Sequence, residues 1–206
     1  EAVHAVAVAL GLPQLQALIP RAADNFHFFA EVCTRMDGHT YPVDGTMLNY
    51  TLYQPVGVCA LISPWNVPFM TGTWKIAPCL AFGNTAVLKM SELSPLSISR
   101  FGELATEAGL PAGALNIVTG YGREAGAALA GHPDINLITF TGSPEVGVTI
   151  QTAAAANHVK CVLELGGKCP QVVFADADLD KAVPVIVGAI IQNAGQTCSA
   201  GSRLLV

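Results

Sequence analysis

The residues best suited to chemistry lie in two short runs in the second half of the chain. Cys198 belongs to the polar, glycine-containing run 192–203, and Glu164 belongs to the apolar and glycine-rich run 163–168. A thiolate is a strong nucleophile, and a carboxylate held among apolar neighbours is a candidate general base. The five histidines lie outside the glycine-rich runs. The pattern therefore favours a cysteine served by a glutamate over a cysteine–histidine pair.

Asn66 is a third candidate, in the run 63–68. Addition of a thiol to a carbonyl gives an oxyanion, which preorganised donors stabilise. The side-chain amide of Asn66 and the backbone N–H of Cys198 are suitable donors. Each assignment has a structural alternative: Cys198 as a small buried residue, Glu164 as a helix cap or a partner of Lys168, and Asn66 as a turn residue between prolines.

The run 140–147 suits a dinucleotide. A hydrophobic strand ends there in glycine and a helix begins, so that backbone N–H groups and the helix dipole can meet a pyrophosphate. The run is not the G-x-G-x-x-G pattern, and an ordinary strand-to-helix turn is the alternative.

Taken together and in order, the runs 63–68, 140–147, 163–168 and 192–203 resemble the NAD(P)-dependent aldehyde dehydrogenase superfamily. The resemblance covers essentially all of the chain from residue 52 onward. It implies that Cys198, Glu164 and Asn66 act in the oxidation of an aldehyde to a carboxylic acid through a thiohemiacetal and a thioester. The residues that it implies for cofactor binding are Ser63, Pro64, Trp65, Lys89, Glu92, Gly122, Phe140, Gly142, Ser143, Val146, Gly147, Leu165 and Gly166.

The segment 89–92 bears on which cofactor is used. In the family that the chain resembles, this segment holds the adenosine ribose. A carboxylate at Glu92 would accept the ribose hydroxyls and repel a 2′-phosphate, so NAD is expected rather than NADP. Met90 stands where that family usually has proline, a departure that removes no ligand.

The composition of the chain favours small molecules as its binding partners. Charged residues make up 12% of the chain and the net charge is -5, so there is no basic footprint for nucleic acid or for a membrane surface. No stretch approaches the ~18 consecutive apolar residues of a membrane span. The six cysteines show no C-x-x-C spacing, which disfavours a zinc site or a disulfide framework. A cytoplasmic enzyme without a metal is expected.

Apolar runs that alternate with helical patterns predict an α/β fold, with a Rossmann-like parallel sheet and the beginning of a second α/β domain. The boundary is expected after residue 162: residues 1–162 form the NAD-binding domain, and residues 163–206 begin the catalytic domain. The extended segment 41–53 is expected to serve homo-oligomerisation. Because the family is about twice as long, the chain is expected to be part of a longer subunit. Strands are expected at 56–62, 86–88, 115–118, 136–140, 159–165 and 171–174. Helices are expected at 22–36, 73–82, from an N-cap at Ser94 to about 108, 124–131, 144–156 and 178–193.

Two alternatives to this function remain open. One is a non-catalytic NAD-binding fragment or pseudoenzyme, which the presence of Cys198, Glu164 and Asn66 disfavours. The other is a CoA-acylating aldehyde dehydrogenase; such members of the superfamily generally do not need the glutamate base, so Glu164 disfavours this alternative too. The segments 68–70 and 73–78 resemble the branch of the superfamily that acts on semialdehydes from aromatic or muconate degradation, and this resemblance implies a semialdehyde substrate.

Overall fold

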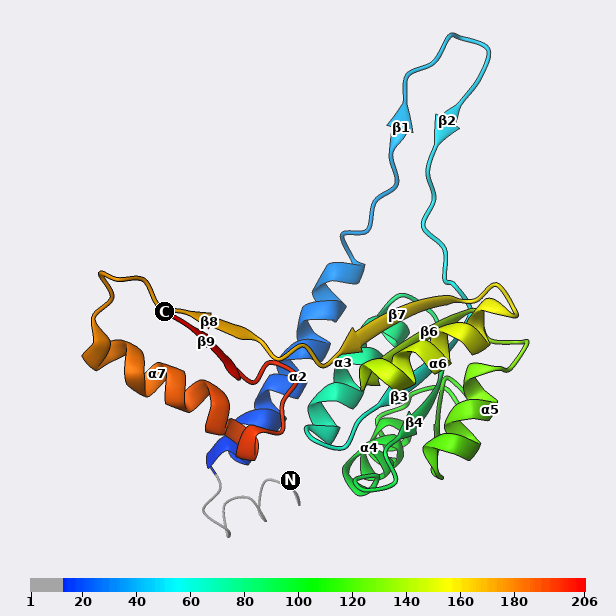
Figure 1. Cartoon of the computed structure of the whole chain (residues 1–206). Coiled ribbons are helices and arrows are strands. Elements are labelled where there is room, and N and C mark those ends of the chain that lie inside the picture. Colours follow the sequence, from blue (N-terminus) through cyan, green and yellow to red (C-terminus); the bar gives the residue numbers. More distant parts are fainter. Residues whose placement is uncertain (1–12) are drawn as a thin grey trace.

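The computed structural model describes residues 13–206, and its centre is a five-stranded parallel sheet (Figure 1). The strand order is β5-β4-β3-β6-β7, so the chain builds outward from β3 in both directions. The α/β class and the parallel sheet predicted from the sequence are confirmed. The strands are β3 (Val58–Ser63), β4 (Thr85–Met90), β5 (Leu115–Val118), β6 (Leu137–Gly142) and β7 (Lys160–Leu165).

Burial in the sheet follows the apolar pattern of each strand. The central strand β3 is buried along almost its whole length, as its continuous apolar run requires of a strand covered on both faces. The edge strand β7 instead alternates, with Cys161, Leu163 and Leu165 on the more buried side and Val162 and Glu164 on the exposed side. This alternation leaves Glu164 on a face that α6 does not cover.

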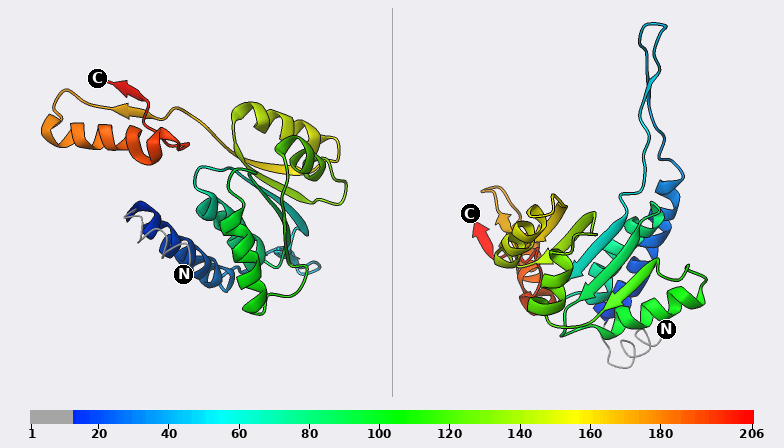
Figure 2. Two further views of the ribbon diagram at one scale, coloured as in Figure 1. Left: turned by 90° about the horizontal axis from the view of Figure 1, so that it is seen from below. Right: turned by 90° about the vertical axis from the view of Figure 1, so that its right-hand side faces the viewer.

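Helices pack on both faces of the sheet (Figures 1 and 2). On one face, α3 (Pro68–Ala81) and α4 (Leu96–Glu107) bury Ile76 and Ile98 against strands β3 and β4. On the other face, α6 (Pro144–Ala155) buries Ile150 against β6. The π-helical turn η1 (Gly122–Gly126) and α5 (Ala127–Ala130) complete that second layer, where a helix over 124–131 was predicted.

The first turns of helices α6, α4 and α3 show how far the sequence predicted where each helix begins. The predicted helix after Ser143 is present as α6, and Ser143 caps it because its Oγ accepts the Val146 N–H at 3.3 Å. Ser94 was predicted to cap α4, and this is wrong: Pro95 occupies the cap position, and the buried Ser94 Oγ has no partner among the described residues. The helix α3 begins at Pro68, earlier than the predicted residue 73, because proline is well suited to the first turn of a helix.

Two segments project from or flank this body (Figure 2). Helix α2 (Pro13–Cys33) packs along α3, and the chain then forms a long antiparallel hairpin with strands β1 (Thr40–Tyr41) and β2 (Asn49–Tyr50). The hairpin fits the predicted extended segment, while its role in oligomerisation stays a prediction. No helix among residues 13–206 has both the length and the apolar character that crossing a membrane requires.

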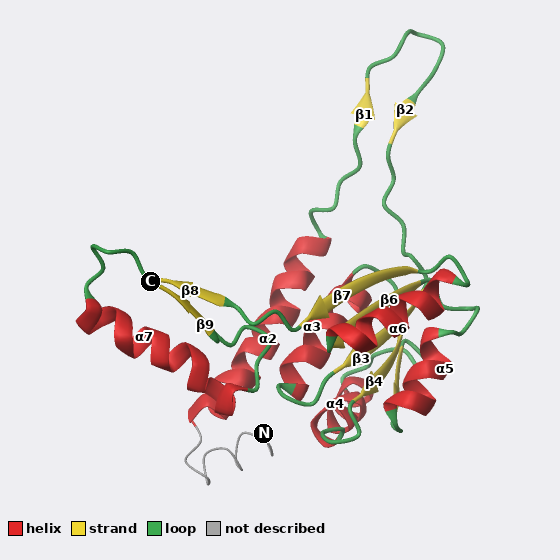
Figure 3. Cartoon of the chain, viewed as in Figure 1, coloured by secondary structure: helices red, strands yellow, loops and turns green. Residues whose placement is uncertain are grey.

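The C-terminal part begins a separate small sheet (Figure 3). Strand β8 (Pro170–Val172) pairs in parallel with β9 (Arg203–Leu205), and α7 (Leu179–Ile191) connects them through the short helical turn η2 (Gln192–Gly195). Strand β7 runs across the predicted boundary at residue 162, so the division into two domains stays a prediction.

Candidate active site

The carboxyl ends of the parallel strands gather the predicted residues at one edge of the sheet. Strand β3 lies between β4 and β6: the chain first continues to β4 and β5 on one side of β3 and then crosses to β6 and β7 on the other. Ligands of open α/β sheets bind at such a switch point, outside the carboxyl ends of the strands. The loop after β3 carries Asn66, the end of β6 carries Gly142, and β7 carries Glu164.

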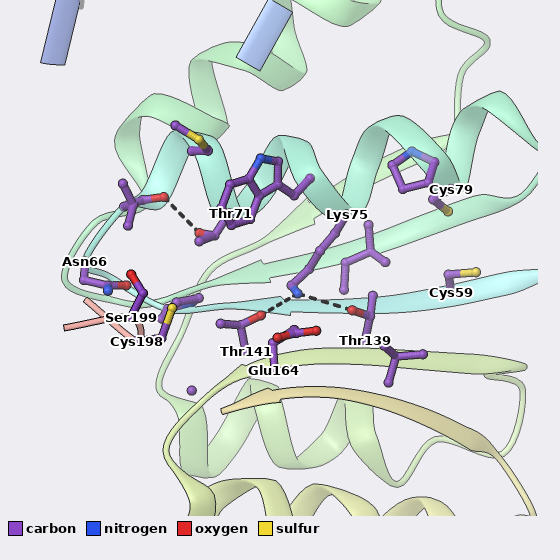
Figure 4. A pocket seen from close by; sticks show the side chains of 18 of the residues that line it. Cys59, Asn66, Thr71, Lys75, Cys79, Thr139, Thr141, Glu164, Cys198 and Ser199 are labelled. Atoms are coloured by element: carbon purple, nitrogen blue, oxygen red, sulfur yellow. Dashed lines mark hydrogen bonds between the residues drawn. The ribbon is translucent and has the colours of Figure 1, made fainter. Parts of the chain in front are cut away.

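A cleft of about 1500 Å³ lies at this edge (Figure 4). It is bounded by the loop after β3, by α3, by the exposed face of β6 and β7, and by the loop 195–199. Asn66, Glu164 and Cys198 all line it, although they are separated by as many as 132 residues in the sequence. The three predicted catalytic residues therefore share one cavity.

Hydrogen bonds join the Asn66 loop to the Cys198 loop. The Asn66 side chain donates from Nδ2 to the Gln196 carbonyl oxygen at 2.8 Å, and Asn193 donates from Nδ2 to the Asn66 carbonyl oxygen at 3.1 Å. Asn193 also donates to the Gln196 carbonyl at 3.2 Å. This network holds the amide of Asn66 beside the loop that carries the thiol (Figure 4).

The backbone of the thiol loop has an uncommon conformation. Asn193 and Ala194 have φ values of 50° and 57°, in the left-handed region that asparagine visits more readily than alanine. The hydrogen bonds of Asn193 to both loops offset the cost of this conformation. The sequence analysis gave no role to Asn193 or Gln196, and an asparagine near the end of the expected helix was the only local signal.

Cys198 differs from the other cysteines in its exposure. All six cysteines are free, and Cys198 is exposed where the others are buried or half-buried. Burial raises the pKa of the Cys161 thiol, and a side-chain hydrogen bond to Cys59 together with burial raises the pKa of Cys79. An accessible thiol in a cleft is the better candidate nucleophile because it can meet a substrate.

Glu164 is exposed, whereas the sequence predicted a buried carboxylate. Its neighbours in sequence, Leu163 and Leu165, are the more buried ones because they face α6, while the alternation of the strand turns Glu164 into the cleft. The alternative role of Glu164 as a helix cap is excluded, since Glu164 lies within strand β7. Glu164 forms no ion pair with Lys168 within the described residues.

Lys75 is a charged residue of the cleft that the sequence analysis missed. It lies on α3 with a relative exposure of 8%, and its Nζ donates to Thr141 Oγ1 at 2.7 Å and to Thr139 Oγ1 at 3.2 Å. Desolvation lowers the pKa of Lys75 to about 8, and the negative charge of Glu164 opposes this shift. A lysine within the apolar stretch 74–80 was the available signal, and Thr71 lies one turn before it on the same helix.

The predicted dinucleotide turn is built around two close approaches. A Cβ added at Gly142 would lie 2.4 Å from the Phe140 ring, and one added at Gly147 would lie 2.8 Å from Leu165. Glycine at Gly147 thus lets α6 pack closely on β7. The first turn of α6 already has internal partners. Ser143 Oγ accepts from the Val146 N–H, and the backbone N–H of Glu145 and then the side-chain hydroxyl of Ser143 lower the pKa of the Glu145 carboxyl.

Glu92 is presented at the carboxyl end of β4. The Lys89 Nζ, almost fully buried, lies 3.0 Å from Glu92 Oε2, and the Glu92 side chain is 39% exposed. Its own backbone N–H and then the Lys89 ammonium hold the pKa of the Glu92 carboxyl below its usual value, and the Gly122 backbone adds to this effect. The segment 89–92 and Gly122, which are predicted to bind the cofactor, therefore lie together.

Several predicted cofactor residues use their side chains within the fold. Ser63 is buried, and its Oγ donates to the Thr71 carbonyl oxygen at 3.3 Å. Phe140 belongs to the core, and Leu165 packs beneath Gly147. The side chains of Ser63, Phe140 and Leu165 therefore face away from a ligand, and only their backbones could contact one. Pro64, Trp65, Gly142, Ser143 and Gly166 line the cleft directly.

Comparisons with known proteins agree with this geometry. The model of the aldehyde dehydrogenase family matches residues 5–206. The chain is 58% identical to the 5-carboxymethyl-2-hydroxymuconate semialdehyde dehydrogenase of Escherichia coli, over 95% of this chain and 42% of the relative. It is 48% identical to human retinal dehydrogenase 2, over 95% of this chain and 39% of the relative.

A solved structure of an aldehyde dehydrogenase from Bacillus cereus in complex with NAD+ superposes with a TM-score of 0.90 at 43% identity. It covers 92% of this chain and 39% of that protein. The chain thus spans about two fifths of the length of these relatives. With a family model that matches nearly its whole length, this chain belongs to the aldehyde dehydrogenase family.

Proposed function

We propose that the intact protein oxidises an aldehyde to a carboxylic acid with NAD, using Cys198 as nucleophile. The observation that carries the proposal is the network of hydrogen bonds that ties Asn66 to the Cys198 loop in the cleft that also contains Glu164. Family membership supports the class of reaction. The assignment of the individual residues is our proposal.

In the first step, the sulfur of Cys198 bonds to the aldehyde carbon while its proton passes to Glu164. The π electrons of the carbonyl move to its oxygen, which becomes an oxyanion. Asn66 Nδ2 carries two hydrogens, of which one is bound to Gln196, so the other can donate to this oxyanion together with the Cys198 backbone N–H.

The second step leaves a thioester on Cys198. When bound, NAD supplies the acceptor for the hydride that the thiohemiacetal carbon loses. Glu164 then releases the first proton to solvent and takes a second one from a water molecule as this water attacks the thioester carbon. The carbon–sulfur bond breaks, the carboxylic acid leaves, and Glu164 returns its proton to the sulfur of Cys198.

The carboxyl end of β4, next to the cleft-forming strand β3, carries residues that fit the adenosine part of NAD. The half-exposed carboxylate of Glu92, held by Lys89, can accept the ribose hydroxyls and would repel a 2′-phosphate, which favours NAD over NADP. The first N–H groups of α6 already have partners in Ser143 and Glu145, so we take Glu92 as the firmer cofactor contact. The structure of the Bacillus cereus relative in complex with NAD+ supports this choice.

We propose a semialdehyde as substrate, because the Escherichia coli relative is named for one. The presence of Glu164 in the cleft favours hydrolysis of the thioester over its transfer to CoA. For the intact protein we further propose a cytoplasmic homo-oligomer that assembles through the β1–β2 hairpin. Exposed apolar side chains along the hairpin support the last point.

Formation of NADH by the intact protein over a panel of aldehydes tests the proposal. Cys198→Ala should reduce turnover by about 10³-fold or more, because the covalent route is lost. Cys161→Ala is the matched control, since Cys161 faces α6 and should leave turnover nearly unchanged. Unchanged turnover in Cys198→Ala would exclude this thiol as the nucleophile, and a requirement for CoA would favour the acylating alternative.

A further inference from the structure

Arg21 places a positive charge at the cleft from outside the parallel sheet. It lies on α2, whose Asn25 donates from Nδ2 to the Thr73 carbonyl oxygen of α3 at 3.0 Å. Farther along both helices, the rings of Phe29 and Phe82 meet edge to face at 6.5 Å. The two helices therefore run in the same direction, so residues earlier in α2 lie toward the start of α3.

This register sets the position of Arg21 along the cleft. Arg21 precedes Asn25 by one turn, about 6 Å along the helix axis. That displacement is toward the start of α3, the end at which the chain arrives from Asn66. Leu18, three residues before Arg21, also lines the cleft, whereas Ala22 is fully buried. The face of α2 that bears Leu18 and Arg21 is thus the face turned to the cleft near its Asn66 end.

The charges of the cleft do not balance. Its charged lining residues are three cations, Arg21, Lys75 and Lys168, and one carboxylate, Glu164. The chain as a whole carries a net charge of -5, so this surplus of positive charge is local. Lys75 is the cation that interacts with Glu164. Within residues 18–206, whose side chains the structure describes, no carboxylate forms an ion pair with Arg21.

We infer that Arg21 binds a carboxylate of the substrate, remote from the aldehyde, and so selects aldehydes that carry an anionic group. This inference rests on the proposed oxidation of an aldehyde at Cys198. A planar guanidinium can donate two parallel hydrogen bonds to a carboxylate, which fixes orientation as well as affinity. Among the cleft's cations, Arg21 is the one with this geometry and without a carboxylate partner among the described residues.

The apolar lining between the two ends is consistent with such a substrate. Trp74 and Met70 of α3 line the same cleft, and half of the Trp74 side chain is exposed there. A carbon chain would contact these side chains while its two polar ends meet Arg21 and the Cys198 loop. Arg21 is exposed, so its guanidinium is accessible to a ligand that enters the cleft. A substrate with a neutral far end would lack the charged group that this guanidinium can bind.

The test compares two aldehydes on the intact protein: a six-carbon aldehyde with a terminal carboxylate, and its methyl ester. We expect the native protein to prefer the carboxylate. Arg21→Gln should lower kcat/KM for the carboxylate by about 10- to 100-fold, mostly through KM, since a charged hydrogen bond is lost. For the ester the change should stay below about threefold. Arg35→Gln is the control, because Arg35 is an exposed arginine just after α2 that is not among the cleft-lining residues.

Each other outcome has a defined meaning. Equal losses for both aldehydes in Arg21→Gln would show a structural role and overturn the inference, as would a loss of preference in Lys168→Gln alone. If the native protein oxidised neutral aldehydes and showed no preference for the carboxylate, the proposed aldehyde oxidation would be supported and carboxylate binding by Arg21 would be contradicted. If it oxidised no aldehyde, both the proposed function and the role of Arg21 would be contradicted. Partial recovery of the preference in Arg21→Lys would support a charge contact.

Discussion

The side-chain amide of Asn66 has an observed structural role and a proposed catalytic one. It holds the Cys198 loop by a hydrogen bond, and we propose that it also stabilises the oxyanion. Its bond from Nδ2 to the Gln196 carbonyl at 2.8 Å orients the side chain before any substrate arrives. Preorganised donors of this kind lower the barrier because they need no rearrangement as charge develops. The turn role that proline neighbours suggest is therefore compatible with the catalytic one.

We expect Asn66→Ala to reduce kcat by about 10²- to 10³-fold while the dissociation constant for NAD changes little. The control is Asn157→Ala, which also removes a side-chain donor to a backbone carbonyl, that of Gly131, but far from the cleft. Steady-state kinetics and NAD titration by fluorescence would separate the two effects. A large loss of NAD affinity with kcat preserved would favour a purely structural role for Asn66.

Lys75 makes the stability of the protein depend on pH. Burial lowers its pKa in the folded protein to about 8, from 10.5. Between these values the unfolded chain holds more protons, so the free energy of unfolding contributed by this group rises with pH. Below about 8 both states are protonated, and the folded state bears the full cost of the buried charge.

In Lys75→Met this rise should be absent. The difference in unfolding free energy between the native protein and the variant should therefore change by on the order of 2–3 kcal/mol from pH 7 to pH 10.5, in favour of the native protein. Urea denaturation at several pH values measures it, with Lys160→Met, which removes an exposed lysine of β7, as the control. Parallel pH curves for Lys75→Met and the native protein would contradict the assigned burial cost.

At the scale of elements, the junction of β6 and α6 depends on how closely backbone and side chains approach. Phe140 is buried at 5% relative exposure, and its ring lies where a Cβ at Gly142 would be placed. The ring cannot move away without disturbing the core between the sheet and α6. The geometry of the turn, and with it the start of α6, therefore requires glycine at this position.

Gly142→Ala should lower the free energy of unfolding by about 1–3 kcal/mol through overpacking and should weaken NAD binding. Gly126→Ala is the matched control, because Gly126 has a helical φ of -66° and an added Cβ would meet no atom within 4 Å. That change should be neutral or stabilise by about 0.5–1 kcal/mol. Thermal and urea unfolding provide the comparison, and a neutral result for Gly142→Ala would show that the ring repacks freely.

At the scale of the whole molecule, the β1–β2 hairpin carries apolar side chains that nothing in the described chain covers. Leu48 is 74% exposed and Leu52 is 68% exposed, and Tyr41 and Tyr50 are about half exposed. A two-stranded hairpin without a core is marginally stable in water, and apolar patches of this kind mark interaction surfaces. This is the physical basis of the proposed homo-oligomer.

The double variant Leu48→Lys with Leu52→Lys should shift the intact protein to a smaller assembly, because it places charges in the proposed contact. Light scattering coupled to gel filtration measures the mass. Leu96→Lys changes an equally exposed leucine, at 82%, on α4 and serves as the control. An unchanged mass in the double variant would locate the contact elsewhere or exclude it.

The sequence determined the parallel α/β fold, because apolar runs and helix signals are local and the crossovers between parallel strands follow from their order. It also singled out Cys198, Glu164 and Asn66 as candidates, through residue type, neighbouring glycines and the family resemblance, and these three residues line one cleft. The cap at Ser94 and the start of α3 were wrong because several nearby residues can begin a helix, and packing selects among them.

Only the tertiary structure decided what surrounds these residues. Glu164 was expected to be buried from its apolar neighbours, yet the alternation of an edge strand with one covered face exposes it. Contacts between segments far apart in the sequence determine three features of the site. They are the hydrogen-bond partners of Asn66, the burial of Lys75 and the position of Arg21 in the lining of the cleft. Such contacts depend on how sheet, helices and loops pack in three dimensions, which no local pattern encodes.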